Sequence, residues 1–322
     1  MADILLDILA PILLMVFLGA VMRWKFSVDL ASLSKLNLYL FVPAFVFDKV
    51  SNSALSWADM GGIVAVTVIQ VGTLGLIVWG IGRAMRMQRK TLATVAMAVM
   101  FYNSGNYGLP LAKLAYEDRG GEVQAFVLMT QNVLTFTVGL SIAAAAHQGG
   151  VGKGLLQLLR MPILPALAAA LAARWWLNGH PDRHLPRAVS ETARFLSDGL
   201  VPIALVTLGA QLGSNPRWPR WGPVSMVLVL RLVFGPVQMA GLLFVLHVMG
   251  QRWGAPFRSM DLWPWPAELL ILTASVPTAV NVLLLTLEVD GDAELAADCV
   301  FWTTVFSCLT ITGWLVVIRW WF

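Results

Sequence analysis

Long apolar stretches alternate with short polar segments along the whole chain. Each stretch is close to the roughly 20 apolar residues that a helix needs to cross a bilayer. Ten of them occur, near residues 3–24, 30–50, 59–82, 91–116, 122–146, 155–178, 188–212, 222–249, 265–288 and 294–320. The connecting segments are too short to hold a separate soluble domain. The pattern predicts an all-α polytopic membrane protein with ten transmembrane helices in a single membrane domain.

Composition supports lipid as the solvent of this chain. Of its 322 residues, 58% are hydrophobic and 12% are charged, whereas soluble domains have about 45–50% apolar and about 25% charged residues. The net charge of +4 therefore informs loop orientation rather than nucleic-acid binding. The first stretch has no basic segment before it, because Asp3 and Asp7 precede or enter the apolar run. We interpret it as a retained helix, not a signal peptide.

Basic residues are unevenly distributed between the loops of the first half. The loops after spans 1 and 3 contain seven of them: Arg23, Lys25, Lys35, Arg83, Arg86, Arg89 and Lys90. The opposite loops contain two, Lys49 and Arg119. Since positive loops stay in the cytoplasm, both termini are expected outside. The second half is less clear, because several arginines, Arg174, Arg183, Arg187, Arg252 and Arg258, fall on the expected outer side.

Prolines recur at matching places in the two halves of the chain. Pro43 in span 2 corresponds to Pro202 in span 7, and Pro110 in span 4 corresponds to Pro277 in span 9. This order predicts one five-helix repeat at 1–147 and a second at 155–322. Because five is odd, the second copy must enter the membrane from the opposite face. Inverted repeats with interrupted helices are the architecture of many secondary transporters.

The stretch from Tyr102 to Pro110 in span 4 should interrupt its helix. Glycine and proline weaken a helix there, and asparagine and serine are costly in lipid, so the stretch requires protein or a watery cavity around it. A packing kink is the alternative. Span 9 has a similar break at Ser275–Asn281. We expect the two breaks to cross and form a substrate site containing Asn103, Ser104, Asn106, Gly108, Pro110, Pro277, Thr278 and Asn281.

Three ionisable residues inside spans are further candidates for ion coupling or for charge near the site. Lys113 could attract an anion, or pair with Glu117 four residues on. Asp198 could bind a coupling H+ or Na+, or could be a helix cap or an interfacial residue. Arg231 has no acidic residue within a turn, so it could face the cavity, snorkel or pair with a distant acid.

Other reactive side chains favour structural roles, and the sequence predicts neither a cofactor nor a metal site. Cys299 and Cys308 lie on one apolar span and read as packing residues, and His180 and His184 as parts of a solvated loop. His247, near the end of span 8, has no acid or nucleophile recognisable beside it. An intramembrane enzyme is therefore disfavoured. A channel is also disfavoured, because crossing inverted repeats suit alternating access.

These motifs together resemble the auxin efflux carrier family, which includes bacterial carriers and the plant PIN proteins. The resemblance rests on NSGNYGLP in span 4, VPTAVN and GDAELAAD around span 9, FVPAFVF in span 2 and PIALVTLGAQL in span 7. It implies a scaffold part and a mobile transport part, helices 4 and 9 crossing at their prolines, and a homodimer in the bacterial inner membrane. It also implies transport of small organic anions, either auxin-like or dicarboxylate compounds.

Two departures and one alternative accompany this resemblance. Lys113 does not belong to the family pattern, and only a short segment, His147–Gly154, separates the halves, where many plant members have a long loop. A carrier like the sodium–bile-acid symporters is the alternative, because it shares the five-plus-five plan. Some of the oxygen ligands for sodium could come from Asn103, Ser104, Asn106, Thr278 and Asn281.

Overall fold

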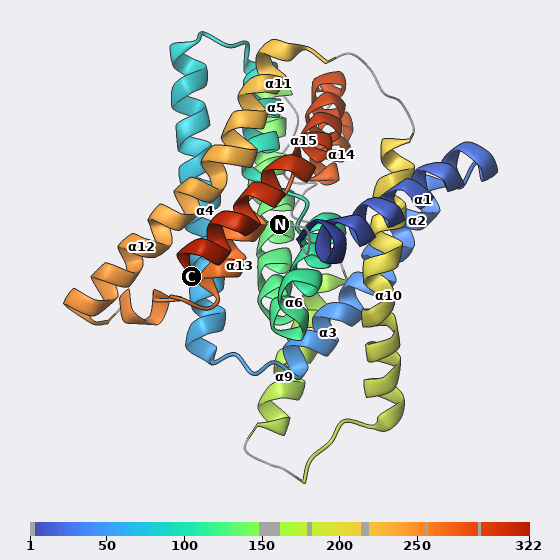
Figure 1. Ribbon diagram of the computed structural model, residues 1–322, viewed down its shortest axis with the longest axis vertical. Coiled ribbons are helices and arrows are strands. Elements are labelled where there is room, and N and C mark those ends of the chain that lie inside the picture. The colour runs from blue at the N-terminus through green and yellow to red at the C-terminus, as the bar shows by residue number, and fades with distance from the viewer. Residues whose placement is uncertain (1–3, 148–161, 179–181, 214–218, 256, 289–290) are drawn as a thin grey trace.

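The computed structural model describes residues 4–147, 162–178, 182–213, 219–255, 257–288 and 291–322, and these are overwhelmingly helical (Figure 1). Short π-helical turns occur at Ile4–Leu9, Asn37–Phe41, Ser104–Gly108, Thr135–Gly139 and Val229–Phe234, and a 3-10 turn occurs at Phe257–Met260. The expected boundary between the halves and the start of span 6 lie outside the described residues.

Five helices form one packed group, which we call the flanking body. They are α1 (Ala10–Phe26), α2 (Leu30–Leu36), α3 (Val42–Ser51), α9 (Ile163–Leu177) and α10 (Arg187–Leu212). Helix α10 packs along α1 and α3, and α3 also packs on α9. Figure 1 shows α1, α2 and α10 together on one side of the molecule.

The remaining helices form a second group, the crossover body. They are α4 (Trp57–Ala84), α5 (Arg89–Met100), α6 (Leu109–Leu134), α7 (Leu140–His147), α11 (Trp221–Leu228), α12 (Gly235–Trp253), α13 (Ala267–Ala274), α14 (Val280–Glu288) and α15 (Ala293–Trp321). Their packing partners lie mainly within this group, such as α4 with α5 and α6, and α15 with α11 and α14. The chain thus folds into two helical bodies that meet along α6.

Two glycines allow α1 and α10 to cross at very short range. A Cβ atom at Gly19 would lie 2.2 Å from the Val206 carbonyl oxygen, and one at Gly209 would lie 1.8 Å from the Val16 carbonyl oxygen. Small residues permit such close backbone approach between helices in lipid, where packing rather than the hydrophobic effect drives association. The first apolar stretch is therefore an integral part of the flanking body.

Both expected helix breaks are present, and they lie against each other. Helix α5 ends at Met100, and α13 ends at Ala274. The Asn103 amide donates to the Pro277 carbonyl at 2.8 Å, and the Ala279 amide donates to the Phe101 carbonyl at 3.0 Å. These bonds form an isolated antiparallel bridge between Tyr102 and Thr278. The crossing chains thereby satisfy backbone groups that the breaks would otherwise leave unpaired.

The position of the first break corrects the role expected for Pro110. The helix opens at Phe101–Asn103, whereas Pro110 lies in the first turn of α6. Because the π-helical turn Ser104–Gly108 continues directly into α6, Pro110 lies inside this helical segment, after the break. The new helix begins at Asn103, whose side-chain oxygen accepts a hydrogen bond from the Asn106 amide at 3.1 Å. Pro110 therefore follows the break and does not create it.

The all-helical membrane architecture is confirmed, but the count of ten spans stays a prediction. Within the described residues, seven helical segments are long and apolar enough to cross a bilayer. One of them, Ser104–Ala146, is divided at Glu117, whose backbone (φ 55°, ψ −140°) is not helical. The described part of α9 is shorter than a full span, and α5, α13 and α14 are short because their helices are interrupted.

Candidate functional site

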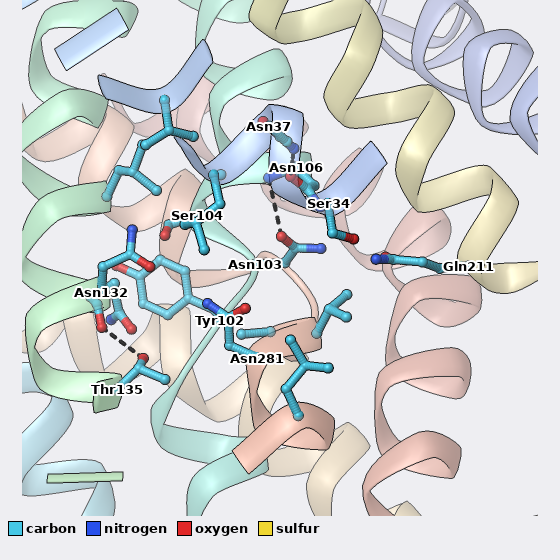
Figure 2. Close-up of a pocket in the computed structure, with 18 residues that line it drawn as sticks. Ser34, Asn37, Tyr102, Asn103, Ser104, Asn106, Asn132, Thr135, Gln211 and Asn281 are labelled. Atoms are coloured by element: carbon cyan, nitrogen blue, oxygen red, sulfur yellow. Dashed lines mark hydrogen bonds between the residues drawn. The ribbon is translucent and has the colours of Figure 1, made fainter. Parts of the chain in front are cut away.

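A cavity of about 110 Å³ lies where the two bodies meet at the crossover. In the flanking body, α2 and α10 contribute to its walls. In the crossover body, the two helix breaks contribute, together with α6 and α14. Most of its polar lining consists of amides and hydroxyls: Ser34, Asn37, Tyr102, Asn103, Ser104, Asn106, Gln131, Asn132, Thr135, Gln211 and Asn281 (Figure 2). Among the described residues, no charged side chain lines the cavity.

Four of the eight predicted site residues line this cavity, namely Asn103, Ser104, Asn106 and Asn281. The other four, Gly108, Pro110, Pro277 and Thr278, do not line it. A Cβ atom at Gly108 would lie 2.7 Å from the Gln124 amide nitrogen, and Gln124 in turn donates to the Ser104 carbonyl at 2.7 Å.

Thr278 supports the crossing itself. It is fully buried, its hydroxyl donates to the Ala98 carbonyl at 2.8 Å, and its amide donates to the Thr303 hydroxyl at 3.0 Å. Thr278 therefore joins the second break to the end of α5 and to α15, and it does not line the cavity.

A chain of three asparagines crosses the boundary between the bodies. The Asn103 side-chain oxygen accepts from the Asn106 amide, and the Asn106 side-chain oxygen accepts from the Asn37 side-chain nitrogen at 2.7 Å. The Asn103 side-chain nitrogen is buried without a hydrogen-bond partner in the described protein. In Figure 2 the Asn103 and Gln211 side chains point toward one another across the cavity. A buried donor left free in this way favours a bound polar solute or water.

Two helix N-termini also face the cavity. The π-helical turn that leads into α6 contributes Ser104, Gly105 and Asn106, and the start of α14 contributes Val280 and Asn281. First-turn amides lack partners within their helix, and the helix dipole places partial positive charge there. The cavity therefore combines a neutral side-chain lining with two electropositive backbone ends, which suits a small anion.

Several cavity residues were not predicted from the sequence. Gln131, Asn132 and Thr135 come from the middle of span 5, Asn37 from span 2 and Gln211 from the end of α10. The adjacent amides in TQNVLT were a usable signal, because two polar side chains in mid-span are costly without a partner. Asn37 and Gln211 gave no such signal, since they lie near span ends, where polar residues are common.

Arg231 lies behind the cavity and not in it. Its side chain is fully buried, and its guanidinium donates to the Val99 carbonyl at 2.8 Å and to the Ala274 carbonyl. The guanidinium carbon is 4.7 Å from the centre of the Tyr102 ring, and Tyr102 lines the cavity. The sequence left three possibilities open: facing the cavity, snorkelling or pairing with a distant acid. The structure shows none of these, because Arg231 contacts carbonyl groups at two helix C-termini.

Lys113 and Asp198 pair with each other across the two bodies. The Lys113 nitrogen is 3.6 Å from the Asp198 carboxylate, which is 64% exposed. Lys113 does not pair with Glu117, because the chain leaves helical geometry at Glu117 and the spacing of four residues no longer puts them on one face. Neither Lys113 nor Asp198 lines the cavity.

The histidines require one correction. His247 does have an acidic partner, since its Nδ1 is 2.9 Å from the Asp261 carboxylate, and Gln251 contacts its other ring nitrogen. The loop between α12 and α13 brings Asp261 back to α12, which the sequence separation concealed. His184 lines a separate, open cavity beside the end of α9, and His180 lies outside the described residues.

A polar cavity between two helical bodies, bounded by the ends of interrupted helices, is characteristic of secondary transporters. Comparison with known proteins agrees with this class. The sequence model of the membrane transport protein family matches residues 4–153 and 152–315. The chain belongs to this family of carriers, the auxin efflux carriers, and is a transporter rather than an enzyme.

Relatives similar to this chain extend over nearly its full length. An "Uncharacterized transporter" of Methanothermobacter thermautotrophicus is 29% identical over 90% of this chain and 89% of its own length. A "Putative malonate transporter" of Rhizobium meliloti is 26% identical over 88% of this chain and 85% of its own length. An "Uncharacterized transporter" of Methanocaldococcus jannaschii is 21% identical over 88% of this chain.

Proposed function

We propose that this transporter is a secondary carrier for small organic anions of the dicarboxylate class, working by alternating access. The observation that carries the proposal is the cavity at the crossover. It lies between two bodies, presents two electropositive helix ends, and has a neutral lining rich in amides. In this proposal, one carboxylate of the solute accepts hydrogen bonds from Asn103 and from first-turn amides of α14.

Neutral amides suit a carrier because they bind an anion and still release it. Asparagine and glutamine have donors and acceptors at every working pH, and a hydrogen bond to a charged group contributes about 1.5–3 kcal/mol. A fixed counter-ion in a dry site would be costly to leave unpaired once the solute departs. The same amides can hydrogen-bond water after release.

The polar lining supports the smaller members of the class. Amides and hydroxyls from several elements line the cavity, and they can hydrogen-bond both carboxylates of a short solute. The name of the Rhizobium meliloti relative, a "Putative malonate transporter", points to the same class.

Contacts between the bodies support alternating access. The cavity lies near the start of span 2, at Ser34 and Asn37, and near the end of α10, at Gln211. Polar contacts that join α6 to the flanking body lie toward the other ends of these elements: Lys49–Asp118 at 2.9 Å, Ser53–Glu122 at 2.9 Å and Lys113–Asp198 at 3.6 Å. In this proposal these contacts close the cavity toward one side of the membrane. Movement of the crossover body would break them and open the cavity toward that side.

The membrane arrangement is part of the proposal. We expect ten spans in two inverted repeats, both termini outside, and a homodimer in a bacterial inner membrane. With this orientation the cavity faces the cytoplasm. A cysteine at Ala2, in a variant with Cys299 and Cys308 replaced by alanine, should react with an impermeant thiol reagent in intact cells. Labelling only after lysis would mean that the N-terminus faces the cytoplasm and that the proposed orientation is wrong.

Uptake into liposomes tests the function directly. Purified protein should exchange internal malonate for external labelled malonate, with a rate that saturates and is inhibited by related short dicarboxylates. Asn103→Ala and Asn106→Ala should each weaken the apparent affinity about tenfold to a hundredfold, the loss of one charge-assisted hydrogen bond. Asn178→Ala, the same change at the end of α9 outside the cavity, is the matched control. Wild-type affinity in Asn103→Ala and Asn106→Ala would mean that the solute binds elsewhere.

A further inference from the structure

The back of the crossover contains an electrostatic arrangement opposite to that of the cavity. Helices α5 and α13 both end there, and the C-terminal end of a helix has partial negative charge and unpaired carbonyls. Val99 lies in the last turn of α5, and Ala274 is the last residue of α13. Two converging carbonyl groups of this kind, in a buried site, are a ready cation site.

One side chain occupies that site. The Arg231 guanidinium donates to both carbonyls, one from each helix, and stacks near the Tyr102 ring. Gly235 leaves room for it, since a Cβ there would lie 3.0 Å from the Arg231 terminal nitrogen. In the described part of the chain its hydrogen-bond acceptors are backbone carbonyls and not carboxylates. The positive charge of Arg231 is therefore balanced by helix ends.

The local helix geometry directs Arg231 to this position. It lies within the π-helical turn Val229–Phe234, immediately before Gly235 and Pro236. A π-helical turn changes the direction of a side chain relative to a regular α-helix and is frequent at functional sites. Arg231 is also fully buried, and burying an arginine is costly unless its charge and donors are used. Both terminal nitrogens have carbonyl partners, whereas Nε has none among the described residues, so the two carbonyl groups are the main compensation for burying this charge.

We infer that Arg231 is a built-in substitute for a bound cation: it neutralises the C-termini of α5 and α13, so that the crossover needs no sodium. Arg231 is then a positioning residue, which acts on the solute only through Tyr102 and the paired breaks. This inference is compatible with the proposed function but does not depend on it, because the cation site can be tested without any solute. It also separates this chain from sodium-coupled carriers that share the five-plus-five plan.

Replacing Arg231 should leave the carbonyl groups of Val99 and Ala274 without their cation. Arg231→Ala should lower the melting temperature of purified protein by roughly 5–10 °C, since it leaves two helix ends without their partner. Millimolar guanidinium, or sodium in place of choline, should restore part of this loss. Arg194→Ala, which removes an exposed arginine paired with Glu191 at 2.6 Å, is the control and should show neither loss nor rescue.

Two further variants separate charge from hydrogen bonding. Arg231→Lys keeps the charge, and Arg231→Gln keeps only hydrogen-bond donors. The melting temperature of the lysine variant should therefore be higher than that of the glutamine variant and should not depend on sodium. Equal stability of the two variants would overturn the inference. If the variants do not fold, wild-type protein still decides it: its melting temperature should be the same in sodium and choline chloride at equal ionic strength. Specific stabilisation of wild-type protein by sodium would contradict a site already filled by Arg231.

Discussion

The two faces of the crossover differ in charge, although they are built from the same two interrupted helices. On the cavity face the N-termini of the α6 and α14 segments meet uncharged amides and empty space. On the opposite face the C-termini of α5 and α13 meet a buried arginine. Helix polarity assigns the positive ends to one face and the negative ends to the other. The comparison shows that two crossed, interrupted helices present amide ends on one face and carbonyl ends on the other, and that in the described structure a charged side chain contacts only the carbonyl ends.

The largest effect should follow from placing a negative charge on the cavity face. Asn103→Asp keeps the size of the side chain and its ability to cap the Asn106 amide, but it replaces a free donor by a carboxylate. Repulsion between like charges costs several kcal/mol at close range, so the affinity for malonate should fall by more than about a hundredfold. Isothermal titration against wild-type protein measures this. An unchanged affinity would mean that the solute is not an anion or does not reach Asn103.

An intermediate effect is expected on the opposite face, where stability and not affinity should change. Thr278→Val removes the hydroxyl that donates to the Ala98 carbonyl at 2.8 Å, and an unsatisfied buried group costs about 1–3 kcal/mol. The melting temperature should drop by several degrees, with the affinity for malonate within about threefold. Thr310→Val, on a more exposed face of α15, is the matched control. A large loss of affinity with normal stability would put Thr278 in the solute site.

A smaller effect should follow from breaking the ion pair between Lys113 and Asp198, which joins the two bodies. Asp198 is largely exposed, and exposed ion pairs contribute about 0–1 kcal/mol. Asp198→Asn should therefore shift transport rates by less than about fivefold. If Asp198 instead binds the coupling proton or cation, the variant should lose gradient-driven uptake but keep exchange. Proteoliposomes with and without an imposed gradient distinguish the two outcomes.

The smallest effect is expected at Pro110. Because the break begins at Phe101 and not at Pro110, Pro110→Ala restores no hydrogen bond across the break. The affinity for malonate should remain within about twofold of wild type. A loss comparable to that of Asn103→Ala would show that Pro110 sets the break after all, through its effect on the preceding π-helical turn.

The sequence predicted the helical membrane class, the family and both breaks, because apolar length and polar residues in mid-span are local signals. Asn103, Asn106 and Asn281 were found in this way. Gln211 and Asn37 were missed because their position depends on how α10 and α2 pack on the crossover body. The partner of Arg231 was unpredictable for another reason: its acceptors are main-chain carbonyls, which every residue has. Tertiary packing alone brings Val99 and Ala274 together.

The central claim is that the crossover separates an anion site from a built-in cation, and one titration tests it most directly. Malonate and its uncharged diamide, malonamide, should be titrated into wild-type protein in sodium-free choline buffer. The account predicts that malonate binds without sodium and at least about tenfold more tightly than malonamide, which has a similar size but no charge. Equal binding of the two compounds, or binding of malonate only after sodium is added, would contradict it.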